Sequence, residues 1–487
     1  MESLSDRIYL RNQNFLSHSS QSATSDSFAI ALRKQKRKEL FSKKRHKDFQ
    51  VPSIPVPTNP TRDLYQSLKQ VLLSDSAGPS LLQVLKYLRT QYSPDNTLAL
   101  KLSKSLNIIQ DLANLLRTVH QTSEEFKETL GCICNLASGP QYITEDLFKL
   151  EIDNYCIGLV DCYDENLAET AIWCLSNLGA DSLKCREKLV SGGTLQILIE
   201  KLKNSHKMQN TILWAIRNLI EGISDLPDPL TANLLQLIKP LLKQKSSESY
   251  IETLWIFSVL TDGSSNQVEK LIKSKCLTLV LSSLQSNSTK VITPSIRSIG
   301  NIAAGTSKQA QILLDHNVLD IIYTVLDKFP NKSTIKKYSF WALSNLTSGI
   351  KPQIDIIVKH PVLIKAVVGI NDCDNRIRKE AITIAYNVAK LGSVESVRAL
   401  VNVGIIKEGK SFLEDSLDND LIFALLDCVM MVLEIFKGPW KHEVICIVKN
   451  SGMADLVEKL VNGKNMKIQK LAGKILKVVE NSELRED

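Results

Sequence analysis

An asparagine near the end of an apolar, helical segment returns at a nearly constant spacing along most of this 487-residue chain. Successive members lie 41 to 44 residues apart. A period near 42 residues in a helical sequence indicates an α-solenoid of the armadillo or HEAT type. A valine replaces one member of the series, which runs Asn135, Asn177, Asn218, Val259, Asn301, Asn345 and Asn387.

A glycine follows four residues after the repeated position in five of these seven units. Glycine adopts the left-handed backbone conformation at low cost, so it commonly stands where a helix ends. The spacing therefore predicts a left-handed turn after each of these helices. The five glycines are Gly139, Gly222, Gly263, Gly305 and Gly349.

A tryptophan stands four residues before the repeated position in four units, at Trp173, Trp214, Trp255 and Trp341. This spacing puts Trp and Asn one turn apart on the same helix face, and stacking repeats about 10 Å apart aligns two parallel ladders. An Asn amide can pair with the N–H and C=O groups of an extended peptide, and a Lys or Arg stem fits between two indole faces. The ladders predict a receptor for an extended, Lys/Arg-rich peptide.

A structural interpretation of the same residues stays open. The Trp side chains could belong to the core, and the Asn side chains could satisfy helix ends. The register of the whole series favours a ligand, because core positions would normally alternate freely among Leu, Ile and Val.

The charge of the chain is confined to one segment. Its 60 Lys and Arg residues exceed its 52 Asp and Glu residues by eight, and nine basic residues with one acid lie between Ser27 and Asp48. The remainder is therefore electrically neutral, which argues against a body that coats nucleic acid. The basic residues of this arm are Arg33, Lys34, Lys36, Arg37, Lys38, Lys43, Lys44, Arg45 and Lys47.

Composition excludes several other classes of protein. A chain with 44% hydrophobic and 23% charged residues can bury a large core, and no apolar run reaches the roughly 18–20 residues of a membrane helix. The ten cysteines mostly lie in apolar patterns and predict reduced core thiols, and the seven histidines have no metal-site spacing. No phosphate-binding loop or nucleophile–base motif is present, so we expect neither enzyme activity nor a cofactor.

The chain divides into five predicted parts. Residues 1–27 are rich in Ser, Asn and Gln and are predicted to be disordered, whereas residues 28–47 read as a basic helix. Residues 48–63 hold four prolines and predict an extended linker. Residues 64–480 form the repeat region, and residues 481–487 form an acidic tail.

Several segments resemble importin alpha, the adaptor family that recognises nuclear localisation signals. The resemblance covers nearly the whole chain and includes the irregularities of the family, such as Arg in place of Trp at Arg297. It implies an all-α fold, a right-handed superhelical α-solenoid of about ten armadillo repeats. The segments are AIWCLSNLGADS (171–182), TLWIFSVLTDG (253–263), VITPSIRSIGNIAAG (291–305), KKYSFWALSNLTSG (336–349) and IRKEAITIAYNVAKLG (377–392).

The resemblance implies two peptide-binding sites. In the major site, a Gly carbonyl, a Thr hydroxyl and an Asp carboxylate hold the critical Lys of the signal, and an ammonium group with three donors suits three such oxygens. The matching major-site residues are Asn135, Gly139, Thr144, Trp173, Asn177, Asp181, Trp214 and Asn218. The matching minor-site residues are Arg297, Asn301, Trp341, Asn345, Glu380 and Asn387.

The chain departs from the family pattern at both sites. Gly131 stands at the first Trp position of the major site, so one slot loses a wall. At the minor site, Thr383 replaces the last Trp and Tyr338 replaces an acid. Ser307 and Lys308 stand where the family is usually acidic. We expect a weakened minor site and an altered preference at the major site.

The basic arm resembles the segment through which the family binds importin beta, including a cluster KKRHK (43–47). Without that partner, such an arm folds back and competes with cargo as a tethered ligand. A simple localisation signal or a solvated charge run remain alternative interpretations of the arm. The resemblance also implies shuttling between cytoplasm and nucleus and, as a possible partner, a nuclear export receptor. It implies no direct contact with nucleic acid and no membrane insertion.

Two function classes therefore compete. The first is a nuclear import adaptor that binds cargo signals in the groove and importin beta through the arm. The second is an armadillo scaffold that binds a different extended peptide and is not a transport receptor. Loss of basic-peptide binding on Asn177→Ala with Asn218→Ala would separate them.

Overall fold

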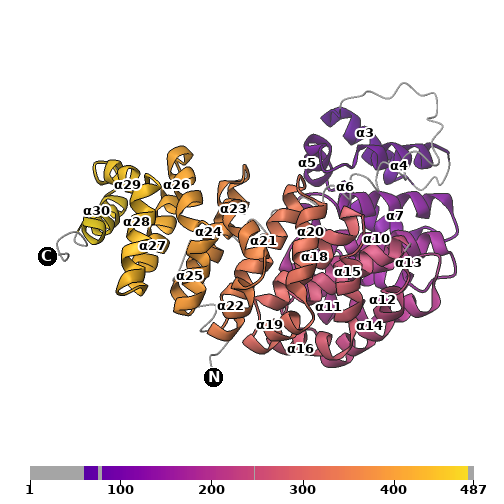
Figure 1. The fold of residues 1–487 in the computed structure, drawn as a ribbon. Helices are drawn as coiled ribbons and strands as arrows, with labels where there is room; N and C mark the ends of the chain where they lie inside the picture. The colour runs from indigo at the N-terminus through magenta and orange to yellow at the C-terminus, as the bar shows by residue number, and fades with distance from the viewer. Residues whose placement is uncertain (1–59, 75–78, 246, 481–487) are drawn as a thin grey trace. The chain divides into compact units, whose positions relative to one another are not determined.

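The computed structural model describes residues 60–74, 79–245 and 247–480, and every regular element among them is helical (Figure 1). The chain forms two compact units, which meet in the sequence between Gly263 and Ser264. The first described helix begins at Arg62 and the last ends at Glu480. The predicted segments 1–27 and 28–47, most of the linker and the tail 481–487 lie outside the described residues.

The first unit contains five consecutive repeats, and the middle three consist of three helices each. The opening repeat is α3 (Arg62–Leu72) and α4 (Pro79–Gln91), and the next is α5 (Thr97–Ser105), α6 (Ile108–Thr118) and α7 (Glu124–Leu136). Then come α8 (Gln141–Lys149), α9 (Ile152–Leu159) and α10 (Glu165–Gly179), followed by α11 (Leu183–Ser191), α12 (Thr194–Asn204) and α13 (Gln209–Ile220). The last repeat of this unit is α14 (Asp228–Leu241) and α15 (Glu248–Leu260).

The second unit also contains five repeats, each of three α-helices. The first two are α16 (Ser265–Lys273), α17 (Cys276–Ser283), α18 (Thr289–Ala303), and α19 (Ser307–Asp315), α20 (Val318–Lys328), α21 (Ser333–Thr347). The third is α22 (Lys351–Val358), α23 (Val362–Val368) with η1 (Gly369–Asn371), and α24 (Asn375–Leu391). The last two are α25 (Val394–Asn402), α26 (Ile405–Asp415), α27 (Asn419–Ile435), and α28 (Pro439–Asn450), α29 (Met453–Val461), α30 (Met466–Glu480).

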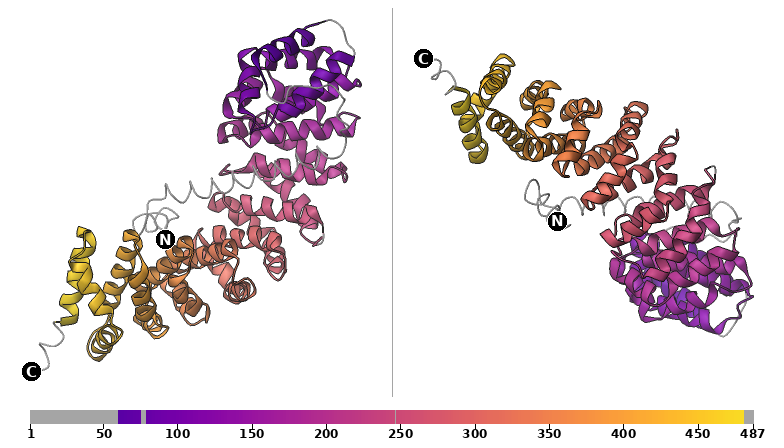
Figure 2. Two further views of the ribbon diagram at one scale, coloured as in Figure 1. Left: turned by 90° about the horizontal axis from the view of Figure 1, so that it is seen from above. Right: turned by 60° about the horizontal axis from the view of Figure 1, so that its bottom comes forward.

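The last helix of each repeat, here called the third helix, packs against the third helices of its neighbours within a unit. In the first unit, α4, α7, α10, α13 and α15 pack in that order, and in the second unit α18, α21, α24, α27 and α30 do so (Figure 2). A three-helix repeat of this length is the armadillo type, whereas a HEAT repeat has two helices. The repeated Asn residues all lie within the last turn or so of third helices.

Local sequence explains where the first helix of a repeat begins. The side chains of Ser182, Ser264, Thr306 and Ser393 each accept a hydrogen bond from the backbone N–H three residues ahead. Each satisfies one N–H that has no partner within the helix, a contribution of about 1 kcal/mol. These caps place successive first helices in the same register.

The left-handed residues lie at the corner between the first and second helices. Asn107, Glu151, Lys275 and Asn317 have φ between 55° and 65°, and Gly193, Gly404 and Gly452 occupy the same place in other repeats. Each of these residues directly precedes a second helix. The left-handed conformation therefore turns the chain sharply from the first helix into the second.

The predicted left-handed turn after the repeated Asn is wrong for four of the five glycines, because only Gly222 has a positive φ, of 77°. At Gly305 and Gly349 a different constraint applies. A Cβ atom there would overlap with Oε1 of Gln309 and Gln353 respectively. Glycine is needed at these two positions because a neighbouring carboxamide approaches the backbone.

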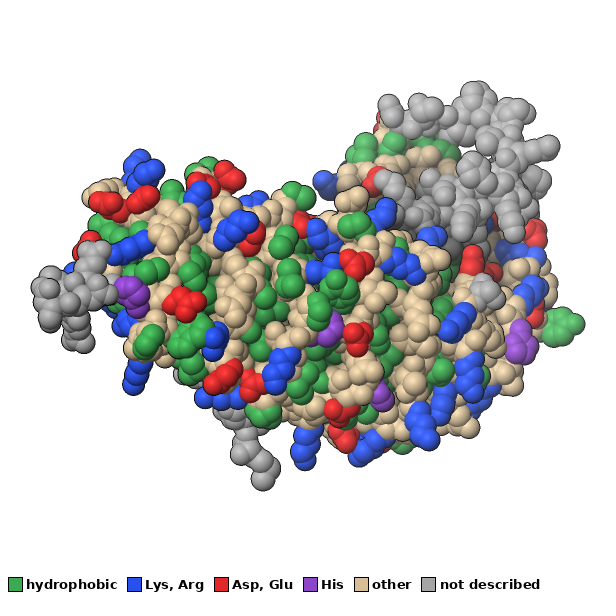
Figure 3. All heavy atoms as spheres, viewed as in Figure 1, with side chains coloured by type: hydrophobic (Ala, Val, Ile, Leu, Met, Phe, Trp, Pro, Cys, Tyr) green, Lys and Arg blue, Asp and Glu red, His purple; other side chains and the backbone are tan. Residues whose placement is uncertain are grey.

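The core consists mainly of Leu, Ile, Val and Ala side chains, and seven of the ten cysteines are buried in it. All ten are free thiols, with Cys373 exposed. No helix among the described residues is long and apolar enough to cross a membrane. On the face drawn in Figure 3, basic and acidic side chains are interspersed, as expected for a neutral body.

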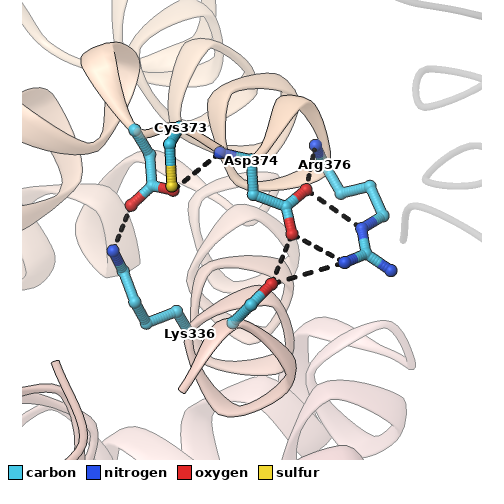
Figure 4. A network of polar contacts seen from close by, with 6 residues as sticks. Lys336, Cys373, Asp374 and Arg376 are labelled. Carbon is cyan, nitrogen blue, oxygen red and sulfur yellow. Dashed lines mark hydrogen bonds and ion pairs between the residues drawn. The ribbon is translucent and has the colours of Figure 1, made fainter. Parts of the chain in front are cut away.

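A polar network joins α21 to the start of α24 in the second unit (Figure 4). Asp374 caps α24 by accepting from the backbone N–H of Arg376, and it also accepts from the Arg376 guanidinium at 2.6 Å and from Ser333. Lys336 of α21 pairs with Asp372 in the turn before α24. The network fixes the entry of a third helix against the preceding one.

Candidate peptide-binding site

The Asn side chains connect neighbouring third helices. In each case the Asn Nδ2 donates to the residue that precedes the equivalent position of the previous repeat. Asn177 donates to the carbonyl of Cys134 at 3.0 Å, and Asn345 donates to the carbonyl of Gly300 at 2.9 Å. Three further Asn side chains donate in the same way, namely Asn135 to the Arg89 carbonyl, Asn218 to the Ser176 hydroxyl and Asn387 to the Ser344 carbonyl.

These hydrogen bonds give the Asn ladder a structural role. One of the two Nδ2 protons is used between repeats, so the amide retains one proton and the Oδ1 acceptor for a ligand. At Asn218, Oδ1 is buried and has no hydrogen-bond partner among the described residues, and the same holds for Nε1 of Trp214 one turn earlier. A buried donor and acceptor without partners are uncommon in folded proteins and require an explanation.

The indole rings of Trp173 and Trp214 contact each other. Their centroids lie 5.9 Å apart at an interplanar angle of 56°, and the two residues are 7% and 4% exposed. To hold a ligand side chain between them, the two indole faces would need a separation of about 7–8 Å, which is two van der Waals contact distances. The open slot predicted between these rings is therefore wrong for this structure, because the rings pack on each other.

Two residues of the predicted lysine site are hydrogen-bonded to each other. The Thr144 hydroxyl of α8 lies 2.8 Å from Asp181 Oδ2, which follows α10. Thr144 is buried, while Asp181 is half-buried and also lies near the Cys185 thiol. Gly139 stands five residues before Thr144, in the turn that leads into α8. Fold topology thus brings the Thr and Asp together across two repeats.

The place above Gly131 is filled by Arg89 of the preceding third helix. A Cβ atom at Gly131 would lie 2.7 Å from Arg89 Nε and 2.9 Å from its Cζ. The guanidinium also pairs with Glu128, with 3.0 Å between Nη1 and Oε2. The wall that the sequence lacks at Gly131 is therefore replaced by a cation of the protein itself.

Three buried glutamates share one register that sequence reasoning largely missed. Glu128, Glu252 and Glu380 each lie seven residues before the repeated position, and each is 7% exposed. Counting back seven residues from Asn135, Val259 and Asn387 would have found them. Only Glu380 was identified from the sequence, through the family resemblance.

The minor-site residues lie on three consecutive third helices, α18, α21 and α24. Trp341 packs against Gly300, where a Cβ atom would overlap with the indole, and its ring lies 6.3 Å from that of Tyr338. Glu380 accepts a hydrogen bond of 2.5 Å from the Ser344 hydroxyl. The buried Arg297 and Asn301 lie on α18.

Two lysines and a threonine lie in the surroundings of the minor site. Burial, and next the like charge of Arg376, lower the pKa of Lys337, which stands beside Tyr338. Lys308 is exposed at the start of α19, and the Thr383 hydroxyl donates to the Lys379 carbonyl within its own helix. Thr383 therefore supplies no aromatic face at the last Trp position.

Comparison with known proteins supports the family resemblance. Importin subunit alpha-1a of Oryza sativa subsp. japonica is 26% identical over 353 residues, covering 69% of this chain and 64% of the rice protein. Importin subunit alpha-8 of Arabidopsis thaliana is 25% identical over 324 residues, covering 66% of this chain and 73% of that protein. The match thus spans less than two thirds of the length of the rice subunit.

Two further comparisons concern the helical repeat. The crystal structure of an engineered protein from the Northeast Structural Genomics Consortium matches with a TM-score of 0.70 and 20% identity, covering 85% of this chain and 98% of that one. A family model described as the TPR-like domain of the E3 ubiquitin-protein ligase UBR4 matches residues 180–368. The predicted all-α armadillo-repeat solenoid is confirmed, as is the resemblance to importin alpha as that of a divergent relative.

Proposed function

We propose that the protein is a nuclear import adaptor whose first unit binds the Lys/Arg-rich localisation signal of a cargo protein. The curated relatives named importin subunit alpha support this role, and they support a binding protein rather than an enzyme. The signal lies as an extended strand across α7, α10 and α13, along the surface that carries Asn135, Asn177 and Asn218.

One observation carries this proposal. Trp214 Nε1 and Asn218 Oδ1 are a donor and an acceptor one turn apart on α13, and both are buried without hydrogen-bond partners among the described residues. An extended peptide offers a C=O and an N–H group at similar spacing, which would satisfy both. Because the two side chains pair only with the backbone of the peptide, they can hold an extended strand of any sequence.

Selectivity for lysine comes from the neighbouring oxygens. The Thr144 hydroxyl and the Asp181 carboxylate are in contact, and Gly139 lies in the turn that leads into α8. An ammonium group prefers such a set because it donates three hydrogen bonds, one of them to a charged acceptor. Once one of the two rings turns away from the other, the indole faces of Trp173 and Trp214 contact the aliphatic stems of flanking basic residues.

The second unit provides a weaker second site in this proposal. Arg297, Asn301, Trp341, Asn345, Glu380 and Asn387 bind the other cluster of a two-part signal. Lys308, Lys337 and Thr383 reduce its affinity, since two of them are cationic and the third has no aromatic face.

The basic arm at residues 28–47 binds importin beta in the proposed cycle, and the adaptor shuttles between cytoplasm and nucleus. Its cluster KKRHK (43–47) also resembles a localisation signal, so the arm competes with cargo when importin beta is absent. Return to the cytoplasm would use a nuclear export receptor.

The groove is tested by fluorescence anisotropy with a labelled Lys-rich peptide. Asn177→Ala with Asn218→Ala should reduce affinity at least tenfold, whereas Asn345→Ala, which removes an equivalent inter-repeat hydrogen bond in the second unit, should leave major-site binding unchanged. Retention of binding in the double variant would contradict the groove. Binding of non-basic peptides alone would favour the armadillo scaffold that is not a transport receptor.

The arm is tested separately by deleting residues 28–47. Binding to purified importin beta should be lost, and the affinity for the Lys-rich peptide should rise. If neither changes, the arm has no role in transport or in self-competition.

A further inference from the structure

The residue before the repeated position occupies a constant place between neighbouring third helices. This position faces two residues of the next repeat, those four and seven residues before the repeated position there. Gly300 illustrates the first contact, because it lies directly under Trp341. Ser344 illustrates the second contact through its hydrogen bond to Glu380.

Arginine takes this place twice. Arg89 of α4 lies above Gly131 and pairs with Glu128 of α7 at 3.0 Å. Arg217 of α13 has its guanidinium carbon 5.9 Å from the ring centre of Trp255 and lies 3.5 Å from Glu252 of α15. The two pairs are therefore equivalent, although one repeat presents a Trp and the other a Gly.

Both arginines thus adopt the pose expected of a ligand cation. A basic ligand residue at such a place would lie against the Trp position and pair with the buried glutamate. Arg217 is 3% exposed, so the interaction at Trp255 already belongs to the protein interior. At Glu380 the corresponding residue is the neutral Ser344, whose hydroxyl donates a hydrogen bond to the carboxylate.

We propose that Arg89 and Arg217 are internal occupants of two cation positions and thereby set the specificity of the groove. Resting on the proposed function, this assigns a ligand with one short basic cluster flanked on both sides by uncharged residues. The basic cluster lies between the two arginines, over α7, α10 and α13. Since third helices lie about 10 Å apart and an extended chain advances about 3.3 Å per residue, the cluster spans about six residues.

The experiment measures binding of labelled peptides that share a central Lys cluster and carry one extra Arg at successive flanking positions. In the wild-type protein, the extra Arg should not increase the affinity of the peptide at the positions facing Glu128 and Glu252, because Arg89 and Arg217 already pair with these carboxylates. Arg89→Ser reproduces the neutral partner found at Ser344, and it should make one flanking Arg favourable by about tenfold or more.

Three further variants test the charge and volume of Arg89, the role of the Glu128 carboxylate and the equivalent position at Arg217. Arg89→Gln keeps most of the side-chain volume above Gly131 but removes its charge, so it should give a smaller gain at the same peptide position. Adding Glu128→Gln to Arg89→Ser should abolish the gain. Arg217→Ser should produce the equivalent gain at the opposite flank, provided that thermal unfolding shows the variant to be folded.

The outcomes distinguish this inference from the proposed function. Wild-type binding without any new flank preference in Arg89→Ser would overturn the inference and leave the adaptor intact. A wild-type gain from Arg at both flanks would also overturn it. If no basic peptide binds either protein, the proposed function itself fails and this assignment fails with it.

Discussion

The indole rings of Trp173 and Trp214 lie in direct contact, with 5.9 Å between their centroids and a tilt of 56°. Both residues are buried, and the contact closes the space in which a ligand side chain was expected. Trp214 Nε1 is buried and has no hydrogen-bond partner among the described residues. Binding of a peptide at this place therefore requires at least one ring to turn away from the other.

A change in indole fluorescence should accompany peptide binding for this reason. Separating the rings replaces an aromatic neighbour by a peptide, and Nε1 gains an acceptor, so both the intensity and the position of emission should change. Titration of the wild-type protein with an unlabelled Lys-rich peptide measures the effect. Trp255→Phe should retain the signal, whereas Trp214→Phe should lose most of it. An unaltered wild-type spectrum at saturation would show that the pair stays closed.

The Thr144–Asp181 pair should determine the requirement for lysine in the ligand. Asp181→Asn removes the only charge of the pair, and hydrogen bonds to charged groups contribute roughly 1.5–3 kcal/mol, so affinity should fall about 10- to 100-fold. Thr144→Val should have a smaller effect because one neutral acceptor is lost. A peptide in which norleucine replaces the central lysine is the control. If Asp181→Asn weakens both peptides equally, the carboxylate does not contact the ammonium group.

The fold was accessible from the sequence because one strict spacing recurs. The positions of Asn177, Asn218 and Asn345 predicted helical repeats, and each of these residues lies near the end of a third helix. The repeat corners were not predicted. Left-handed residues such as Glu151 and Lys275 have no compositional signature, since tertiary packing imposes a conformation that their residue types seldom adopt.

The candidate site was only partly accessible. The resemblance to importin alpha identified Thr144 and Asp181, which the structure brings together. It could not show that Asn177 donates to Cys134, nor that Arg89 fills the space above Gly131, because both depend on how far apart neighbouring helices pack. A missing side chain in a repeat was predicted to leave a gap, but the preceding repeat supplies the atoms that fill it.

The close approach at Gly349 should make even a methyl group unfavourable at this position. A Cβ atom there would displace the carboxamide of Gln353, which donates to the Ser307 carbonyl at 2.7 Å. Gly349→Ala should therefore destabilise the protein by about 1–3 kcal/mol. Gly158→Ala is the matched control, because the exposed end of α9 leaves open space there, and it should stabilise by about 0.5–1 kcal/mol. Urea denaturation followed by circular dichroism measures both, and equal effects would contradict the packing argument.

Asp374 should contribute to stability in a pH-dependent manner. Hydrogen bonds from the Arg376 guanidinium, followed by the one from Ser333, hold the pKa of Asp374 well below its usual range. A carboxyl whose folded-state pKa is depressed stabilises the protein above its unfolded pKa of about 4, and this contribution is lost as the pH falls below that value. The residue also caps α24, so Asp374→Ala should cost about 1–2 kcal/mol at pH 7.

The difference in unfolding free energy between wild type and Asp374→Ala should therefore shrink between pH 5 and pH 3. Asp374→Asn separates the two contributions, because an amide oxygen can still accept from the backbone N–H of Arg376 but carries no charge. Its cost should be smaller than that of alanine at pH 7, and its stability should match that of the wild-type protein more closely at pH 3. A gap between wild type and alanine that stays constant over this range would mean that Asp374 acts only as a helix cap.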